Sequence, residues 1–193
     1  MTGLPIYRTA ISGEWIDYNG HLRDAYYSLI VSLAADAMMD RIGLDEGYRK
    51  RTRCTLYTLE MHMHFLREVK QSQTVDVWLR ILGTDAKRIH AAYDLYCAGN
   101  GQPAATAELM LLHVCQGDSP AAQPFPPDIQ VALTALTAAS AAGSPTAGPE
   151  SAAPAMAATP TAATPTAATP TGATPTAATP IPGSRRMELR KRS

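Results

Sequence analysis

Residues 15–24 read Trp-Ile-Asp-Tyr-Asn-Gly-His-Leu-Arg-Asp, and they separate two segments with different patterns. The preceding segment, residues 6–16, is typical of a first strand that runs into a polar turn. From about Arg23 to Ile42, apolar residues recur at three- and four-residue spacing, which predicts one long helix. Gly43 stands where a glycine would end this helix. The expected apolar face of the helix consists of Tyr26, Leu29, Ile30, Leu33 and Ala37.

Four strand-like runs follow, at about 54–66, 74–83, 88–98 and 104–116. In the first run, alternation predicts one shared face for the apolar residues Tyr57, Leu59, Met61, Met63 and Phe65. We interpret the charged residues 48–53 as a loop, and we expect a short final helix that ends near Leu136. This order predicts an α+β domain in which a five-stranded antiparallel sheet wraps around one long helix. The edges of such a sheet favour pairing with a second copy.

The composition changes after the last predicted helix. Every aromatic residue and every His lies in residues 1–136, whereas nine of the 15 prolines follow Gly143. Repeats such as Thr-Pro-Thr-Ala-Ala cannot bury a core. We therefore predict a folded domain at 1–136 and a disordered tail with a basic end at 137–193.

Charge and cysteine content narrow the class of protein. Residues 1–136 carry 12 Lys/Arg against 15 Asp/Glu, a net charge of −3, which does not favour a nucleic-acid partner. No apolar run is long enough to span a bilayer, and the first residues lack the pattern of a signal peptide. Cys54, Cys97 and Cys115 are odd in number and lack CxxC spacing, which predicts reduced thiols. These features together predict a cytoplasmic protein without a membrane partner.

The turn at 17–21 concentrates groups that can do chemistry. The backbone N–H groups of Asp24 and Ala25, at the start of the helix, could stabilise an oxyanion. Asp17 could act as a general base on water or attack as a nucleophile. Asn19 could orient that water, and His21 could donate to the substrate carbonyl. The alternative is an Asx-type turn in which Asp17 and Asn19 cap the helix and His21 only packs. The residue types alone leave both interpretations open.

The motif Trp-Ile-Asp-Tyr-Asn-Gly-His-Leu at 15–22, followed by Tyr26-Tyr27, resembles that of the 4-hydroxybenzoyl-CoA thioesterase-like hotdog enzymes. Residues 57–68 (Tyr-Thr-Leu-Glu-Met-His-Met-His-Phe-Leu-Arg-Glu), 82–90 and 107–114 are similar to the betainyl-CoA thioesterase branch, which acts in carnitine breakdown. The resemblance covers about residues 6–136. It departs at Cys115, where related chains tend to carry Asp.

The resemblance implies a hotdog fold and a thioesterase that hydrolyses an acyl-CoA without a cofactor or metal. Betainyl-CoA is the first substrate to test, and short, medium-chain or aromatic acyl-CoA esters come next. It also implies a homodimer or homotetramer with active sites at the subunit boundary, with Asp17 as catalytic carboxylate. A non-catalytic acyl-CoA-binding protein is the alternative. Dehydratase chemistry is disfavoured because His21 lies in the turn and the long helix contains no His.

A betainyl group would carry a trimethylammonium, which aromatic faces can hold by cation–π attraction. Trp15, Tyr18, Tyr26 and Tyr27 surround the turn in sequence and could supply those faces, although aromatic residues at a helix start often belong to the core. Lys87 and Arg88, at a predicted turn, could contact CoA phosphates or could be ordinary surface charge.

Three polar residues alternate along the run at 54–66. Glu60, His62 and His64 would share one face, from which Glu60 and His62 could reach substrate in a partner subunit. We favour the alternative of a solvated or interface face. A His-x-His pair without a third ligand is weak evidence for a metal site, so we expect none.

Overall fold

The structure, a computed structural model, describes residues 1–143; of the tail predicted at 137–193, residues 144–193 lie outside the described residues. The elements are β1 (Leu4–Ala10), the 3-10 helix η1 (Gly13–Trp15), α1 (Asp24–Arg41), α2 (Glu46–Thr52), β2 (Cys54–Phe65), β3 (Thr74–Thr84), β4 (Arg88–Cys97), β5 (Ala105–Cys115), the two-residue β6 (Ala121–Ala122) and α3 (Pro127–Ala142). All four strand runs predicted after the helix are present, with ends that differ by one residue at most. The first strand is shorter than predicted, because residues 13–15 turn into η1.

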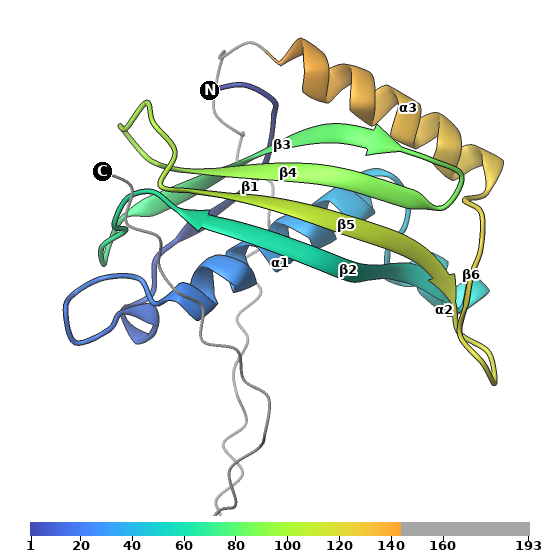
Figure 1. Cartoon of the computed structure of the whole chain (residues 1–193), viewed down its shortest axis with the longest axis horizontal. Helices are drawn as coiled ribbons and strands as arrows, with labels where there is room; N and C mark the ends of the chain where they lie inside the picture. Colours follow the sequence, from blue (N-terminus) through green and yellow to red (C-terminus); the bar gives the residue numbers. More distant parts are fainter. Residues whose placement is uncertain (144–193) are drawn as a thin grey trace, which may run out of the picture. The chain divides into compact units, whose positions relative to one another are not determined.

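The sheet is antiparallel, in the order β1-β3-β4-β5-β2, and β6 pairs with β5. Helix α1 lies against one face of the curved sheet, while the other face is open to the viewer in Figure 1. Ile30, Val31, Ala34 and Met38 of α1 are fully buried in the core between helix and sheet. This is the predicted α+β architecture of a sheet wrapped around one helix.

The buried face of α1 differs from the predicted one. Residues Tyr27, Ile30, Val31, Ala34, Ala35 and Met38 are buried, whereas Leu29 is exposed and Leu33 is only partly buried. Apolar residues occur on more than one side of this helix, so spacing alone did not determine its rotation. Gly43 does follow the helix end with a φ of +83°, as predicted.

Two further predictions about the ends of elements were wrong. The charged segment 48–53 is not a loop but mostly helix α2, which begins because the Asp45 carboxylate accepts a hydrogen bond from the N–H of Tyr48 (2.7 Å). Helix α3 does not end near Leu136 but continues to Ala142. Its last turn covers the edge of β3 beyond the point where β1 stops, and Ser140 Oγ accepts a hydrogen bond from Ile81 N–H (3.1 Å).

A β-bulge at Leu59 divides β2 into two parts with different alternation. Thr58 pairs with Leu111 and Glu60 with Met110, so Leu59 is the extra residue. Thr58 and Met61 therefore both face α1, and Tyr57 faces the other side. The prediction of one shared face from Tyr57 to Phe65 was wrong for this reason.

The cysteines also differ from expectation. Cys54 and Cys115 are directly opposite each other on β2 and β5 and form a disulfide, whereas Cys97 is a free, buried thiol. The prediction of three reduced thiols is therefore wrong for two of them, because strand register rather than sequence spacing brings them together. Among residues 1–143, no helix is long and apolar enough to cross a membrane.

Candidate functional site

The turn that follows β1 is closed by its own backbone and by one carboxylate. The N–H of Asp17 donates to the carbonyl of His21 (2.8 Å), and Gly20 adopts a φ of +84°, which glycine tolerates. Asp17 Oδ1 accepts hydrogen bonds from the N–H groups of Asn19 (2.8 Å) and His21 (3.0 Å). This is an Asx-type turn. The N-cap residue of α1 is Arg23, which makes no side-chain cap, so Asp17 and Asn19 cap the turn and not the helix.

The turn also sets the charge of its carboxylate. The hydrogen bond from His21 N–H, followed by those from Asn19, lowers the pKa of Asp17 below its ordinary value. Asp17 is therefore ionised at neutral pH, the form required of a nucleophile or a general base.

The segment between β2 and β3 fastens this turn to the rest of the domain. Leu22 N–H donates to the carbonyl of Val69 (2.7 Å), and His21 forms an isolated β-bridge with Lys70. In the same segment, Glu68 Oε2 lies 3.0 Å from His21 Nε2. Glu68 had no role in the sequence analysis, because it follows the end of a strand and its partner lies 47 positions earlier (68 minus 21).

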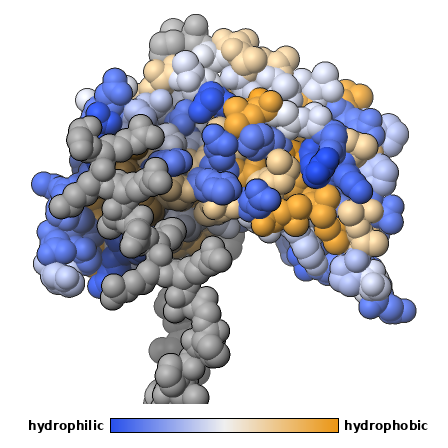
Figure 2. All heavy atoms as spheres, viewed as in Figure 1, coloured by the Kyte–Doolittle hydropathy of each residue, from blue (hydrophilic) through white to orange (hydrophobic). Residues whose placement is uncertain are grey.

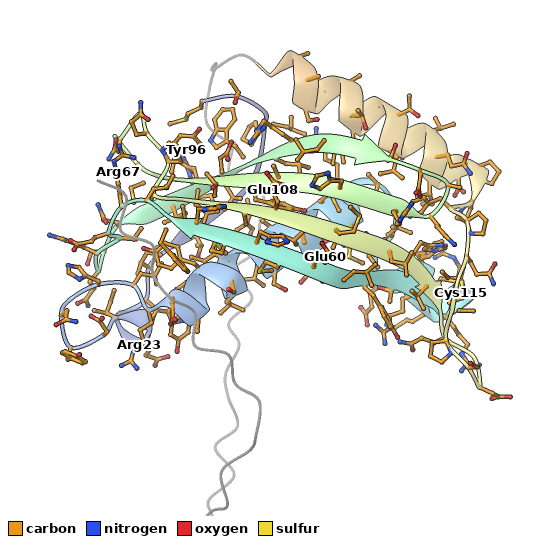
Figure 3. The ribbon with its side chains drawn as sticks, viewed as in Figure 1. Arg23, Glu60, Arg67, Tyr96, Glu108 and Cys115 are labelled. Atoms are coloured by element: carbon orange, nitrogen blue, oxygen red, sulfur yellow. A yellow bond between two sulfur atoms is a disulfide. The ribbon has the colours of Figure 1, made fainter. Side chains whose placement is uncertain are left out.

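A cavity of about 350 Å³ that is broadly open to solvent lies beside the turn. Its lining includes His21, Asp24, Tyr27, Phe65, Arg67 and Glu68. The rings of Tyr27 and Phe65 meet edge to face, with 5.2 Å between their centroids. Asp17 and Asn19 are not among the lining residues; they lie in the adjoining turn. Figure 3 shows Arg67 and Arg23 at this end of the molecule, and Cys115 at the opposite end.

The start of α1 offers one of the two predicted oxyanion donors directly. The N–H of Asp24 has no hydrogen-bond partner among residues 1–143. The N–H of Ala25 donates to Asp24 Oδ1 (2.8 Å). An oxyanion that used both N–H groups would have to displace the Asp24 carboxylate from Ala25.

The structure does not gather the predicted aromatic residues around one space. Trp15 stacks on Tyr26, with 5.3 Å between centroids, and Tyr18 is 96% exposed. Of the four, only Tyr27 lines the cavity, where it meets Phe65. Phe65 was assigned only to a strand face, so its place beside the turn was missed.

Glu60 and His62 lie on the sheet face turned away from α1, as do His64 and Glu108. The shared face of Glu60, His62 and His64 was predicted correctly, and within one protomer it is not the face that carries the cavity. His62 Nε2 lies 3.8 Å from Glu60 Oε2, and His90 Nε2 lies 3.3 Å from Glu108 Oε2. Figure 2 shows polar and apolar side chains mixed over this open face, and Figure 3 places Glu60 and Glu108 on it.

Lys87 and Arg88 are far from the turn. The turn adjoins the start of β3, where Ile11 N–H donates to Gln73 O (2.9 Å), whereas Lys87 follows the end of that strand. The 11 residues of β3 span roughly 35 Å at about 3.3 Å each. Arg88 is held by the Asp85 carboxylate (2.6 Å), whose pKa falls to about 2, chiefly through the Lys87 N–H. Within one protomer, the structure therefore does not bring these two residues to the turn.

One group among the described residues has the composition of a metal site. Ligand atoms of Cys54, His113 and Cys115 lie within 4.8 Å of one another. The two sulfurs are joined in the disulfide, and both ring nitrogens of His113 are engaged, with Tyr48 Oη (2.9 Å) and the carbonyl of Gln123 (2.8 Å). This group stabilises the end of the domain opposite the turn and takes no part in the cavity.

Comparison with known proteins assigns a family to this arrangement. The model of the thioesterase-like superfamily matches residues 12–133. A betainyl-CoA thioesterase of Pseudomonas aeruginosa is 46% identical over 139 residues, which are 72% of this chain and 87% of that protein. An L-carnitine dehydrogenase/betainyl-CoA thioesterase of Agrobacterium fabrum is 38% identical over 58% of this chain, and the match spans 22% of that longer protein.

Solved structures agree with this assignment. A candidate thioesterase from Pseudomonas putida KT2440 has a TM-score of 0.64 and 41% identity, over 80% of this chain and 99% of that one. A Staphylococcus aureus protein solved in complex with CoA has a TM-score of 0.67 and 26% identity, over 80% of this chain and 92% of that one.

Proposed function

Because the chain belongs to the thioesterase-like superfamily and is a thioester hydrolase of acyl-CoA, we propose that its substrate is betainyl-CoA, which it cleaves to the free acid and CoA. The observation that carries this proposal is the 46% identity to a betainyl-CoA thioesterase over 87% of that protein's length. The matched residues 12–133 include the turn at 17–21, which we propose to be catalytic, and the segment between β2 and β3 that is hydrogen-bonded to it.

In the proposed mechanism, the thioester carbonyl lies at the start of α1, with its oxygen near the N–H of Asp24. The ionised Asp17 either removes a proton from the attacking water or attacks the carbonyl carbon itself. When Asp17 is the base, the water adds to the carbonyl carbon, the C–S bond breaks, and the CoA thiolate takes up the proton that Asp17 removed. When Asp17 is the nucleophile, the C–S bond breaks as a mixed anhydride forms with Asp17, and water then hydrolyses this anhydride, which releases the free acid, restores the carboxylate and supplies the proton to CoA. His21 would donate to the carbonyl, and Asn19 would orient the water.

We also propose that the active unit is a homo-oligomer that pairs along β2. This strand is at the edge of the sheet, and from Leu59 to Leu66 most of its residues are exposed. Leu59 is 52% exposed. A second copy paired along β2 would satisfy the free backbone groups and cover this side chain. Contacts of Glu60 and His62 with substrate, and of Lys87 and Arg88 with CoA, would then come from the second copy.

Thiol release from betainyl-, acetyl-, hexanoyl- and benzoyl-CoA by the purified full chain tests the substrate. We expect the highest kcat/KM for betainyl-CoA. Hydrolysis of the other three with none of betainyl-CoA would refute the substrate assignment. If a folded preparation cleaved none of the four, the assignment of hydrolase activity to this chain would fall too.

A further inference from the structure

We infer that the cavity beside the catalytic turn is a subsite for the quaternary ammonium of the acyl group, with Glu68 as its counter-charge and Phe65 as its aromatic wall. This inference rests on the proposed function and assigns a role to two residues outside the predicted catalytic set. It also places the acyl group on the α1 side of β2 and not on the open sheet face.

The chemistry of the acyl group restricts where such a subsite can lie. A trimethylammonium has no proton to lose and no hydrogen-bond donor, so a protein can hold it only by carboxylate charge and by aromatic faces. In betainyl-CoA a single methylene separates this nitrogen from the thioester carbon. The cation-binding groups must therefore adjoin the start of α1, where the carbonyl is bound.

The cavity meets this distance requirement, because Asp24, the first residue of α1, and Glu68 line the same space. Asp36 also lines a cavity, but it lies 12 residues along α1 from Asp24 (36 minus 24), which is about 18 Å at 1.5 Å per residue. A cation one methylene from the carbonyl cannot reach Asp36 from the helix start.

Glu68 is the less constrained of the two carboxylates that line the cavity. Its side chain is 64% exposed, and its one partner among residues 1–143 is the ring of His21, 3.0 Å from Oε2. Asp24 also has one engaged oxygen, but Oδ1 accepts a hydrogen bond from the backbone N–H of Ala25 (2.8 Å), which holds this carboxylate against the start of α1. The one guanidinium in the lining, that of Arg67, donates to the carbonyl of Pro103 (2.9 Å) and is thereby directed toward the β4–β5 loop.

Phe65 supplies the aromatic surface. Its ring rests against Tyr27 on one side and remains 55% exposed, so part of the ring is open to the cavity. Tyr27 itself is buried and contributes to the floor. A carboxylate and an aromatic ring from residues three positions apart (65 and 68) thus converge on one space.

The test compares betainyl-CoA with 3,3-dimethylbutanoyl-CoA, in which carbon replaces the charged nitrogen and the shape is kept. The measured quantity is the ratio of kcat/KM for the two esters in each variant of the full chain. Any effect on the shared hydrolysis steps, such as loss of the contact between Glu68 and His21, changes both esters and cancels in the ratio.

We expect Glu68→Gln to lower this ratio about tenfold, which corresponds to about 1.4 kcal/mol. Phe65→Leu, which keeps an apolar side chain, should lower it about threefold, in the range of one exposed cation–π contact. Glu46→Gln is the matched control, because Glu46 is an exposed carboxylate on α2, paired with Lys50 (2.8 Å) and absent from the cavity. It removes the same net charge, and its ratio should equal that of the unaltered protein.

Two results would overturn the inference alone. One is an unaltered protein that cleaves both esters with equal kcat/KM, and the other is a Glu68→Gln variant that keeps the full ratio. Both results would leave the thioesterase activity standing. If folded, unaltered protein hydrolyses neither of the two esters, both the inference and the proposed function are overturned.

Discussion

Asp17 Oδ1 accepts a hydrogen bond from the backbone N–H of His21 at 3.0 Å, so the candidate catalytic carboxylate is also the acceptor that shapes its own turn. An amide side chain at this position has an oxygen that can accept the same bond. A single substitution, Asp17→Asn, can therefore remove the charge at position 17 while the hydrogen bond that shapes the turn is kept.

Asp17→Asn should keep the turn and lower kcat at least about 100-fold, the size of a lost acid–base group. Steady-state thiol release from betainyl-CoA measures the effect, and circular dichroism with thermal unfolding checks the fold. Asp118→Asn, in the exposed loop after β5, is the control and should retain full activity. Near-normal turnover by Asp17→Asn would remove Asp17 from the mechanism.

The lowered pKa of Asp17 predicts how the activity depends on pH. A carboxyl whose pKa is lowered in the folded state stays ionised below its ordinary value of about 3.9, and its contribution to stability is lost only as pH falls through the lowered value. We therefore expect the acid limb of kcat/KM that reports Asp17 to lie below about pH 3.9, the ordinary Asp value. Initial rates in overlapping buffers from pH 3 to 9 measure it, with Asp17→Asn as reference. A single acid limb near pH 6.5 would instead indicate that an imidazole is the base.

The disulfide should stabilise the domain without being needed for chemistry. It closes a separation of 61 residues, for which loop-closure entropy gives about 4 kcal/mol of unfolding free energy. The urea concentration at the unfolding midpoint should be lower in the presence of reductant, and lower in the Cys54→Ser variant, than for the unaltered, oxidised protein. Cys97→Ser removes the free thiol and keeps the disulfide. Reductant should therefore lower the unfolding midpoint of this variant by the same amount as that of the unaltered chain. If native chains titrate with three free thiols and not one, the disulfide assignment is wrong.

Assembly along β2 can be tested with a matched pair of exposed apolar residues. Leu59→Glu places a charge on the edge strand and should shift the protein toward monomer, because a buried unpaired carboxylate is costly. Val131→Glu, on α3 at 71% exposure, should leave the oligomer unchanged. Light scattering coupled to size exclusion reads the mass of each. If the oligomer has the same mass after Leu59→Glu, the interface must lie on another surface.

The sequence pattern predicted the order of the elements well because strand alternation and helix spacing are local. The rotation of α1 was not predictable in this way, since Leu29 and Leu33 are as apolar as the residues that are buried. In the candidate site, too, the local part was predictable from the sequence and the part formed by long-range contacts was not. Asp17, Asn19 and His21 are recognisable as one cluster, but Phe65 and Glu68 reach it through the long-range pairing of residues 21–22 with 69–70. The Cys54–Cys115 pair likewise depends on the register of two strands.

The bulge in β2 also has a consequence for chain length. Deletion of Leu59 would leave a regular ladder in which Thr58 still faces α1, Glu60 still faces away and Phe65 keeps its place beside the turn. Deletion of a residue between Met61 and Phe65 would instead exchange the two faces of the remaining strand, because side chains alternate with a period of two. Among residues 57–65, the strand can therefore lose one residue at this point without exposing its core face, and relatives one residue shorter in β2 would be expected to lack the residue at position 59.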